Sequence, residues 1–448
     1  MPTDLRADIP SPGPAARSIG ALALLAASTP LTLSLGALAM LAPRRASPVD
    51  ASEPRTILIS GARMTKALVL ARAFASAGHR VIMCESEGYA LNAHRFSRAV
   101  HAFELLPRID SPYYARRLKR LIARHDVDVY VPVTSPAGSL VDSALAPDLG
   151  ELCEVLHAGP EHISALDDKA QFAQAAQGAG LAVPYTLKVT SAEDVLDFDF
   201  AGHDRPFILK SIAYDPVGRL DMTRLPMADR AAMERHVRAL PIRPENPYVL
   251  QEFIAGTEYC THGFFRDGAL RVHCACASSA FQVNYAHLNK PAIRKWVEAF
   301  GKALGFTGQA SFDFIEAEDD GRIYAIECNP RTHSAITLFA GDERLIAAYL
   351  DKAGNTPAIE PRPDAQPTYW LAHEIWRLID PAARGARGRQ VANLLEGRDA
   401  VLAKGDPLPF LALHHLHVPA LLLRALANGR DWHRLDFNIG KLVMAGGD

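Results

Sequence analysis

The spacing of the cysteines gives little indication of a disulfide or of a metal site. Its 448 residues include six cysteines, and no two of them form a Cys-x-x-Cys pair. A zinc site or a thioredoxin-like redox motif is therefore not indicated. Cys274 and Cys276 alternate within an apolar run, where we interpret them as small core residues. This use of cysteine suits a reducing compartment.

An excess of charge of either sign is also missing. The chain has 48 Lys and Arg residues against 50 Asp and Glu residues, a formal net charge of −2. Proteins that bind nucleic acid usually carry a basic surface, so no nucleic-acid partner is indicated. The basic stretch 113–126 is interpreted as a solvated helix face.

The glycine-rich motif of dinucleotide-binding proteins is absent. The strand–turn–helix pattern of residues 56–78 has only Gly61 in its turn, although Glu85 ends the next strand where a ribose-binding acid would stand. G-x-G-x-x-G is needed for close approach to a pyrophosphate. A nicotinamide dehydrogenase therefore ranks low among the alternatives.

Charged side chains are missing from one stretch near the N-terminus, Ile19 to Pro43. About 20 such residues suffice to cross a bilayer. We expect an apolar helix here, with attachment to a membrane as the first interpretation, a hydrophobic docking helix as the second and a signal peptide as the third. Arginines on both sides leave its orientation open. Deletion of residues 1–45 is expected to leave a soluble and active protein.

The predicted elements divide the rest of the chain into three parts after an N-terminal tail at residues 1–54. Residues 55–160 alternate strands with helices, which is typical of a parallel sheet covered by helices. Residues 161–358 combine helices with antiparallel strands, and residues 359–448 form a mixed extension. The expected fold class is α/β followed by α+β, with an N-terminal apolar helix.

Two carboxylates stand in apolar strands that an acidic turn joins. Asp313 lies in "SFDFIE" and Glu327 in "AIECNP", and the turn "EDDG" would make these strands antiparallel neighbours. Buried alone, the two groups would repel each other, and a divalent cation removes that conflict. Asn329 lies two residues after Glu327 and so on the same side of the strand. These oxygen donors suit magnesium or manganese held together with phosphates.

Arg331 continues this alternation, and we predict that it faces the phosphate being transferred. Upstream, Lys169 opens a helix and Lys210 ends a buried-looking strand. A lysine after such a run is unusual without an anionic partner, and lysines bind phosphates as point charges. The segment from Gln251 offers backbone groups to an adenine edge, and an acid beyond it suits ribose hydroxyls. The predicted nucleotide-binding residues are Lys169, Lys210, Gln251, Glu252, Ile254 and Glu258.

From about Leu166 to Phe339 these pieces occur in the order "LDDK", "FILKS", "QEFIAGTE", "SFDF" and "ECNPR". In this order they resemble the ATP-grasp superfamily. The resemblance implies a pre-ATP-grasp domain followed by an ATP-grasp domain, with ATP and two Mg²⁺ or Mn²⁺ ions as cofactors. It implies metal ligation by Asp313, Glu327 and Asn329, and stabilisation of the transferring phosphoryl group by Arg331. The glycine-rich flap of most such enzymes is reduced here to Gly218, with Arg219 as a weak substitute.

Longer stretches, such as "SGARMTKALVLAR", "ILKSIAYD", "ECNPRTHSAIT" and "DFNIGKLV", resemble the mycosporine-glycine synthases over almost the whole chain. The resemblance implies an ATP-dependent ligase that joins an amino acid, glycine above all, to the cyclohexenone 4-deoxygadusol in the biosynthesis of UV-protective mycosporines. A ring oxygen would be phosphorylated and then displaced by the amine. A cytoplasmic catalytic domain, attached to a membrane through residues 19–43, and a homodimer are expected.

Two questions stay open at this stage. His333 is either the general base that takes the proton of the amine or a structural histidine of the turn, with equal weight. The amino-acid carboxylate has three candidate partners in Arg219, Lys290 and His262. Competing functions are a carboxylate–amine ligase working through an acyl phosphate, and a scaffold that binds ATP without catalysis. The run "HHLH" at residues 414–417 is interpreted as packing rather than metal ligation.

Overall fold

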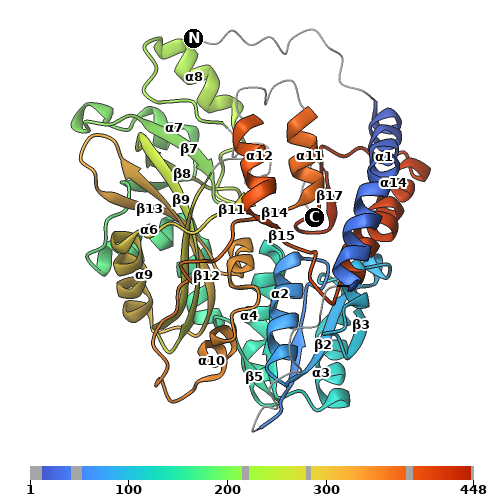
Figure 1. Cartoon of the computed structure of the whole chain (residues 1–448). Coiled ribbons are helices and arrows are strands. Elements are labelled where there is room, and N and C mark those ends of the chain that lie inside the picture. Colours follow the sequence, from blue (N-terminus) through green and yellow to red (C-terminus); the bar gives the residue numbers. More distant parts are fainter. Residues whose placement is uncertain (1–12, 42–52, 214–220, 279–283, 380–386, 445–448) are drawn as a thin grey trace.

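The computed structural model describes residues 13–41, 53–213, 221–278, 284–379 and 387–444 (Figure 1). The expectations placed on Gly218 and Arg219 lie outside the described residues. Within the described ranges the chain forms a parallel domain, two antiparallel sheets and a C-terminal extension that returns to the N-terminal helix.

The first domain is a five-stranded parallel sheet in the order β3-β2-β1-β4-β5. Its central strand, β1, is buried from both faces, and Ile57, Leu58 and Ile59 are fully inaccessible. Such continuous apolar strands are typical of parallel sheets covered by helices, so the prediction of an α/β domain is confirmed. The strands are β1 (Thr56–Ile59), β2 (Arg80–Ser86), β3 (Ala102–Leu106), β4 (Val129–Val131) and β5 (Glu154–Val155), and the main helices are α2 (Thr65–Ser76), α3 (Tyr114–His125) and α4 (Pro136–Gly150).

The second part holds an antiparallel sheet in the order β10-β9-β12-β13. Aromatic residues of α6 and α9 pack with Phe312 of β12 into one core, which fixes the sheet on its helices. The prediction of antiparallel strands joined by short turns is confirmed. The elements are α5 (Pro160–Asp167), α6 (Lys169–Gly178), β9 (Gly256–Arg266), β10 (Ala269–Ala277), α9 (Pro291–Leu304), β12 (Gly308–Ala317) and β13 (Ile323–Asn329).

A smaller antiparallel sheet, β6-β8-β7, forms a separate lobe with its own apolar core. Its strand β7 ends at Lys210 and Ser211, which face the larger sheet across the cavity described below. The lobe therefore supplies one wall of the site. It consists of β6 (Thr186–Val189), α7 (Ala192–Leu196), β7 (Phe207–Ser211), α8 (Arg230–Ala239) and β8 (Tyr248–Glu252).

The C-terminal extension connects the first domain to the segment that follows β13. The N–H of Thr65, at the start of α2, donates to the carbonyl of Asn438 at 2.8 Å, and the Asn438 amide donates to the Ser334 hydroxyl at 2.7 Å. The extension thereby holds the start of α2 next to the segment that follows β13. After η5 (Ser334–Phe339) and α10 (Arg344–Leu350) come β14 (Thr368–Tyr369), α11 (Leu371–Ile379), α12 (Arg387–Glu396), β15 (Arg398–Asp399), α13 (Leu408–Ala412), η7 (Leu413–His417), α14 (Val418–Ala427), β16 (Arg434–Asp436) and β17 (Lys441–Val443).

The predicted apolar helix is α1 (Pro14–Leu41), and it lies along α14 (Figure 1). Small buried residues on one face let α13 and η7 approach α1 closely as well, with Gly36 against Leu411 and Thr32 against His415. Polar contacts anchor it as well: Arg17 forms an ion pair with Asp431 at 2.5 Å, and the Thr32 hydroxyl lies 3.0 Å from Nε2 of His415. This packing argues against the expectation that residues 1–45 are dispensable, because their removal would uncover apolar surface on α14.

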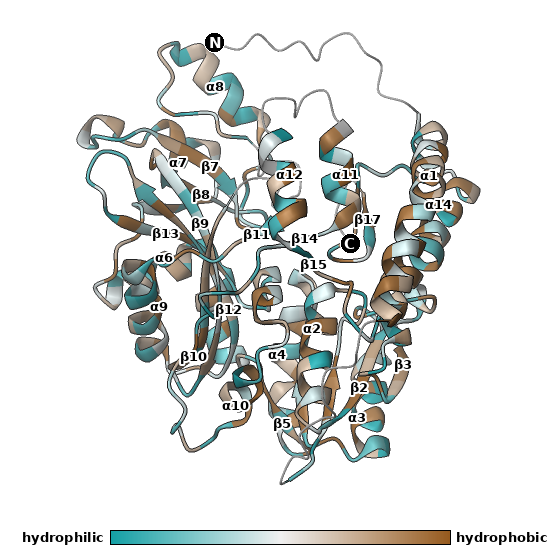
Figure 2. Cartoon of the chain, viewed as in Figure 1, coloured by the Kyte–Doolittle hydropathy of each residue, from teal (hydrophilic) through white to brown (hydrophobic). Residues whose placement is uncertain are grey.

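The opposite face of α1 is apolar and exposed, as its colours in Figure 2 show. Leu33, Leu38 and Leu41 are 50%, 65% and 82% accessible. Two helical stretches, α1 and residues 408–427, are long and apolar enough to cross a membrane, but core helices and signal sequences meet the same criterion. The helix is thus docked along one face and apolar on the other.

Candidate active site

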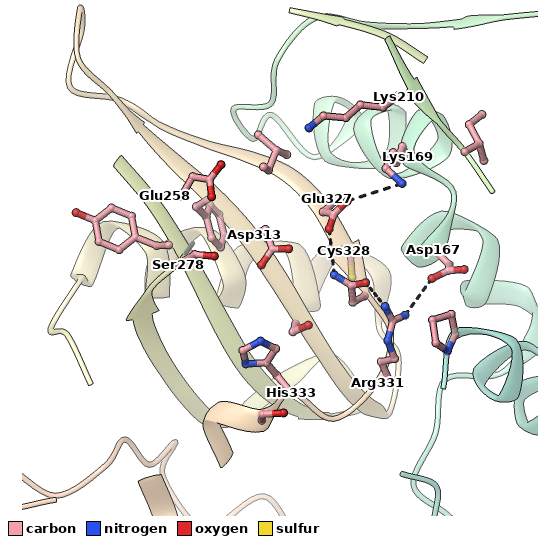
Figure 3. Close-up of a pocket in the computed structure, with 18 of the residues that line it drawn as sticks. Asp167, Lys169, Lys210, Glu258, Ser278, Asp313, Glu327, Cys328, Arg331 and His333 are labelled. Atoms are coloured by element: carbon pink, nitrogen blue, oxygen red, sulfur yellow. Dashed lines mark hydrogen bonds and ion pairs between the residues drawn. The ribbon is translucent and has the colours of Figure 1, made fainter. Parts of the chain in front are cut away.

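A cavity of about 550 Å³ lies between the first domain, the larger antiparallel sheet and the smaller lobe. This volume is within the range of small-molecule sites. Figure 3 shows Lys169 and Lys210 at one end, His333 at the other, and Asp313 and Glu327 between them. Of the predicted site residues the cavity is lined by Lys169, Lys210, Glu258, Asp313, Glu327, Asn329, Arg331 and His333.

The two carboxylates predicted to pair stand directly opposite each other. Asp313 of β12 is the partner of Glu327 of β13 in the antiparallel ladder, and a register shift follows Asp313. Burial and the charge of Glu327 raise the pKa of Asp313 well above its usual range. Burial acts in the same direction on Glu327, but the charges of Lys169 and Lys210 outweigh it and lower the pKa of Glu327. The site therefore favours one negative charge where two carboxyl groups meet.

This donor set fits a divalent cation. Asp313, Glu327 and Asn329 present hard oxygen atoms, and a cation would relieve the repulsion that raises the pKa of Asp313. No group of three or more His, Cys, Asp or Glu side chains suited to a metal occurs in the described part of the chain. Two carboxylates and an amide leave ligand positions for phosphate oxygens, as is common for Mg²⁺.

A chain of polar contacts runs along the floor of the cavity (Figure 3). Lys169 Nζ lies 3.7 Å from Glu327, the Asn329 amide donates to Glu327 at 3.4 Å, and Arg331 donates to Asn329. Arg331 also lies 3.5 Å from Asp167, which sequence reasoning did not assign. The sequence signal for Asp167 was the doublet "DD" before Lys169. Asp168 caps α6 through the N–H of Ala170, and Asp167 lines the cavity.

The side chains of the residues whose backbone is predicted to bind adenine have other partners. The Gln251 amide donates to the Thr186 hydroxyl and to the carbonyl of Ile326, the Glu252 carboxylate accepts from the N–H of Tyr185, and Ile254 is 3% accessible. Their side chains do not line the cavity. Only the backbone of this segment is left for a base, so the adenine role stays a prediction.

His333 has a structural duty in this arrangement. Its Nδ1 accepts from the N–H of Ala335 at 3.2 Å and so caps η5. Burial, together with the charges of Lys66 and Arg331, lowers the pKa of His333 to about 3. A neutral histidine with so low a pKa is a weak proton acceptor at neutral pH. Of the two open interpretations, these contacts support the structural one.

The candidate partners of an amino-acid carboxylate are also accounted for. Lys290 pairs with Glu316 at 2.6 Å and does not line the cavity. His262 is fully buried, with its Nδ1 accepting from the N–H of His333 at 3.3 Å. Arg219 lies outside the described residues. Lys290 is therefore not placed to bind a substrate carboxylate, whereas Nε2 of His262 is buried and makes no hydrogen bond among the described residues.

Lys66 is a cavity residue that sequence reasoning missed. It belongs to the first turn of α2, is 7% accessible, and its ammonium donates to the carbonyl of Thr332 at 2.5 Å. The two residues are 266 positions apart in the chain. The available signal was a lysine inside the otherwise apolar helical run "TKALVLA".

Contacts elsewhere bear on two alternatives. Glu85, the acid that a nicotinamide site would use for ribose, instead accepts from the N–H and the guanidinium of Arg63, at 2.9 and 3.2 Å. In "HHLH", His414 and His417 are buried in η7 and His415 contacts α1, which favours packing over ligation. Neither alternative gains support.

Of the comparisons with known proteins, only the one with solved structures finds matches. No protein-family model matches the sequence, and a search of curated proteins also finds no match. Among solved structures, an ADP complex of N5-carboxyaminoimidazole ribonucleotide synthetase has a TM-score of 0.54 at 15% identity, covering 79% of this chain and 87% of its own. The enzyme of this type from Staphylococcus aureus, also with ADP, has a TM-score of 0.51 at 15% identity, covering 72% and 82%.

A third similar structure is the biotin carboxylase domain of 2-oxoglutarate carboxylase from Hydrogenobacter thermophilus, in complex with MgADP, ADP and bicarbonate. It has a TM-score of 0.54 at 15% identity and covers 69% of this chain and 72% of its own. Identities this low show the fold alone. The chain has the ATP-grasp fold, preceded by a parallel α/β domain, as the sequence predicted.

Proposed function

We propose that the chain is an ATP-dependent ligase that forms a C–N bond. The observation that carries the proposal is the set Asp313, Glu327 and Asn329 facing Lys169 and Lys210 across one cavity. Solved structures of similar fold hold ADP or MgADP. A metal–nucleotide complex requires carboxylates that hold the metal and cationic side chains that bind the phosphates.

In this proposal Lys169 and Lys210 bind the phosphates of ATP, and Glu258 binds the ribose. Adenine pairs with the backbone of residues 251–254. Asp313, Glu327 and Asn329 hold Mg²⁺ or Mn²⁺, two ions in all, and the metal supplies charge neutralisation at the phosphates. Arg331, fixed by Asn329 and Asp167, stabilises negative charge on the group in transfer.

The chemistry proposed for the acceptor has two steps. An oxygen of the acceptor attacks the terminal phosphorus of ATP, the bond to ADP breaks, and a phosphate ester of the acceptor forms. The neutral amine then attacks the carbon that bears this oxygen, and the C–O bond breaks with its electron pair leaving on phosphate. The surplus proton of the amine passes to the departing phosphate or to solvent. An enol or carboxyl oxygen leaves poorly, whereas phosphate leaves well, which is why ATP is consumed.

The proposed acceptor is 4-deoxygadusol and the proposed amine is glycine, giving mycosporine-glycine, on the strength of the sequence stretches that resemble mycosporine-glycine synthases. The second candidate is a ligase whose acceptor is a carboxylate and whose product is an amide or peptide. The same cavity suits both, because each acceptor carries an oxygen that can be phosphorylated.

Incubation with ATP, Mg²⁺ and a panel of amino acids, with 4-deoxygadusol or a panel of carboxylic acids, separates these candidates. Mass analysis of products and release of ADP are the readouts. We expect an adduct of the cyclohexenone and an amino acid. Adducts formed only with carboxylic acids would favour the second candidate. Release of ADP that no acceptor stimulates would refute a ligase and favour an ATP-binding scaffold.

Lys210→Ala is expected to raise the apparent KM for ATP by roughly 10- to 100-fold, since a hydrogen bond to a charged group contributes about 1.5–3 kcal/mol. Burial lowers the pKa of Lys210 although Glu327 opposes this, so a nearby phosphate would strengthen its charged form. The measurement is steady-state kinetics with varied ATP. Lys188→Ala, an exposed lysine of β6 in the same sheet, is the control. An unchanged KM for ATP would count against the phosphate role.

The exposed apolar face of α1 suits the interface of a bilayer, and we propose membrane association through it. Residues 18–41 carry no charge, and the face includes Leu33, Leu38 and Leu41. Because α1 is docked on α14, the proposed mode is binding along the membrane surface with the catalytic parts in the cytoplasm.

A further inference from the structure

The end of the cavity opposite the ATP-facing lysines is built around Lys66. The ammonium reaches it from α2, in the first domain, and contacts the carbonyl of Thr332 on the segment after β13. With 7% of its surface accessible, this side chain is held inside the protein rather than in solvent. Lysines are seldom buried without a partner that takes up their charge.

The charges around Lys66 do not balance it. Arg63 and Arg331 are its nearest cationic neighbours, and each is already paired, with Glu85 and Asp167. No carboxylate lies within ion-pair distance of Lys66 in the described ranges. Burial and the two arginines lower its pKa to about 7, against a smaller opposing effect of Asp436. This end of the cavity therefore has an excess of positive charge.

Two further polar atoms nearby lack partners. The Thr332 hydroxyl and Nε2 of His262 are buried, and neither makes a hydrogen bond among the described residues. The carbonyl of Thr332 accepts from Lys66, and the N–H of the next residue, His333, donates to Nδ1 of His262, so these groups are neighbours. Buried polar groups are nearly always hydrogen-bonded, so unpartnered groups beside an unbalanced cation point to a ligand.

We propose that Lys66 binds the anionic oxygen of the acceptor substrate, a delocalised oxyanion of the kind carried by the enolate of a cyclic 1,3-dicarbonyl or by a carboxylate. The inference rests on the proposed function, whose reaction phosphorylates such an oxygen. A bound oxyanion would supply the missing negative charge. It would lie beside Thr332, next to His333, whereas Lys169 and Lys210 stand at the end of the cavity away from His333.

The proposal has a pH signature. An anion next to Lys66 raises the pKa of its ammonium, so binding above pH 7 takes up a proton. The charged side chains that act on Lys66 are Arg63, Arg331 and Asp436. Burial lowers the pKa of His262 and His333, so both stay neutral at this pH and do not take up the proton.

Calorimetric titration of the full chain with MgADP present tests the site, with 1,3-cyclohexanedione and acetate as separate probes. We expect one probe to bind, with proton uptake at pH 8 seen as a dependence of the heat on the buffer. Lys66→Met should weaken that binding by about 10-fold or more and abolish the proton uptake, because a charged hydrogen bond is lost. Lys66→Arg should restore part of the affinity, and Lys188→Met should change nothing.

The thermal midpoint without ligands separates this role from a structural one. A Lys66 pKa lowered from 10.5 to about 7 means that the charged group costs stability below pH 7, and this cost fades as the pH rises toward 10.5. Lys66→Met should therefore not lower the midpoint at pH 7. A lowered midpoint with equal loss of MgADP binding would show a structural role and overturn the proposal.

Absence of binding by both probes, or equal binding by Lys66→Met, would also overturn it. The probe that binds identifies the acceptor class. If the protein binds a probe through Lys66 but releases no ADP with any acceptor, the oxyanion site is retained and only the proposed ligase activity is refuted. The two failures are thus distinguishable, because binding is measured apart from turnover.

Discussion

Glu327→Gln is expected to abolish product formation, with a loss on the order of 10³-fold or more. The substitution keeps the size of the side chain and removes the charge that faces Lys169 and Lys210. Burial and the charge of Glu327 raise the pKa of Asp313, whereas Lys169 and Lys210 lower that of Glu327, so Glu327 keeps its negative charge more readily. Its loss removes the principal ligand for a metal–nucleotide complex.

The fold should survive this change. Glu327 is only partly buried, with 32% of its side chain accessible, and a glutamine can still accept from the Asn329 amide. Repulsion between Glu327 and Asp313 disappears as well, which offsets the lost contact with Lys169. We expect an unchanged circular dichroism spectrum and a thermal midpoint close to that of the unmodified protein.

Two measurements check the assignment. The first is turnover, with Glu316→Gln as the control, because Glu316 belongs to the same strand as Asp313 and does not line the cavity. The second is the rise of the thermal midpoint with ATP plus Mg²⁺ compared with ATP plus EDTA, a difference that Glu327→Gln should lose. Normal turnover by this variant would refute the metal assignment.

The sequence could bring together the residues proposed to hold metal and phosphates because their signals are local. Asp313 and Glu327 lie in two strands that one tight turn joins, so their pairing follows from the turn and the alternation. The structure confirms the antiparallel pairing of these strands, with the two residues in register. The spacing of Glu327, Asn329 and Arg331 likewise indicated a shared direction, and all three line the cavity.

What could not be predicted depends on contacts between distant segments. Lys66 stands in an otherwise apolar helical run, but that signal names no partner, and only the fold brings the side chain to Thr332. The Gln251 amide, whose partners lie on β6 and β13, was equally hidden. Hydrophobic composition predicted the helix α1, but not that residues 400 positions away would cover one side of it.

Deletion of residues 1–41 is expected to destabilise the protein by about 3–5 kcal/mol and to promote aggregation. Leu22, Leu25 and Leu35 of α1 are partly buried against the main core, and burial of a leucine contributes about 1.5–3 kcal/mol when complete. The deletion also removes the ion pair with Asp431 and the contact with His415. The measurement is thermal and urea unfolding with light scattering.

A matched variant separates docking from membrane binding. Leu33→Glu with Leu38→Glu changes only exposed positions of α1, so stability and turnover should stay as they are. Sedimentation with phospholipid vesicles should instead fall sharply, because the apolar face that enters the interface is interrupted by charge. Vesicle binding equal to that of the unmodified chain would refute membrane association, and an unchanged midpoint after the deletion would refute docking. The docked face of α1 accounts for the expected loss of stability, and its free apolar face accounts for the expected vesicle binding, so the two effects depend on different residues.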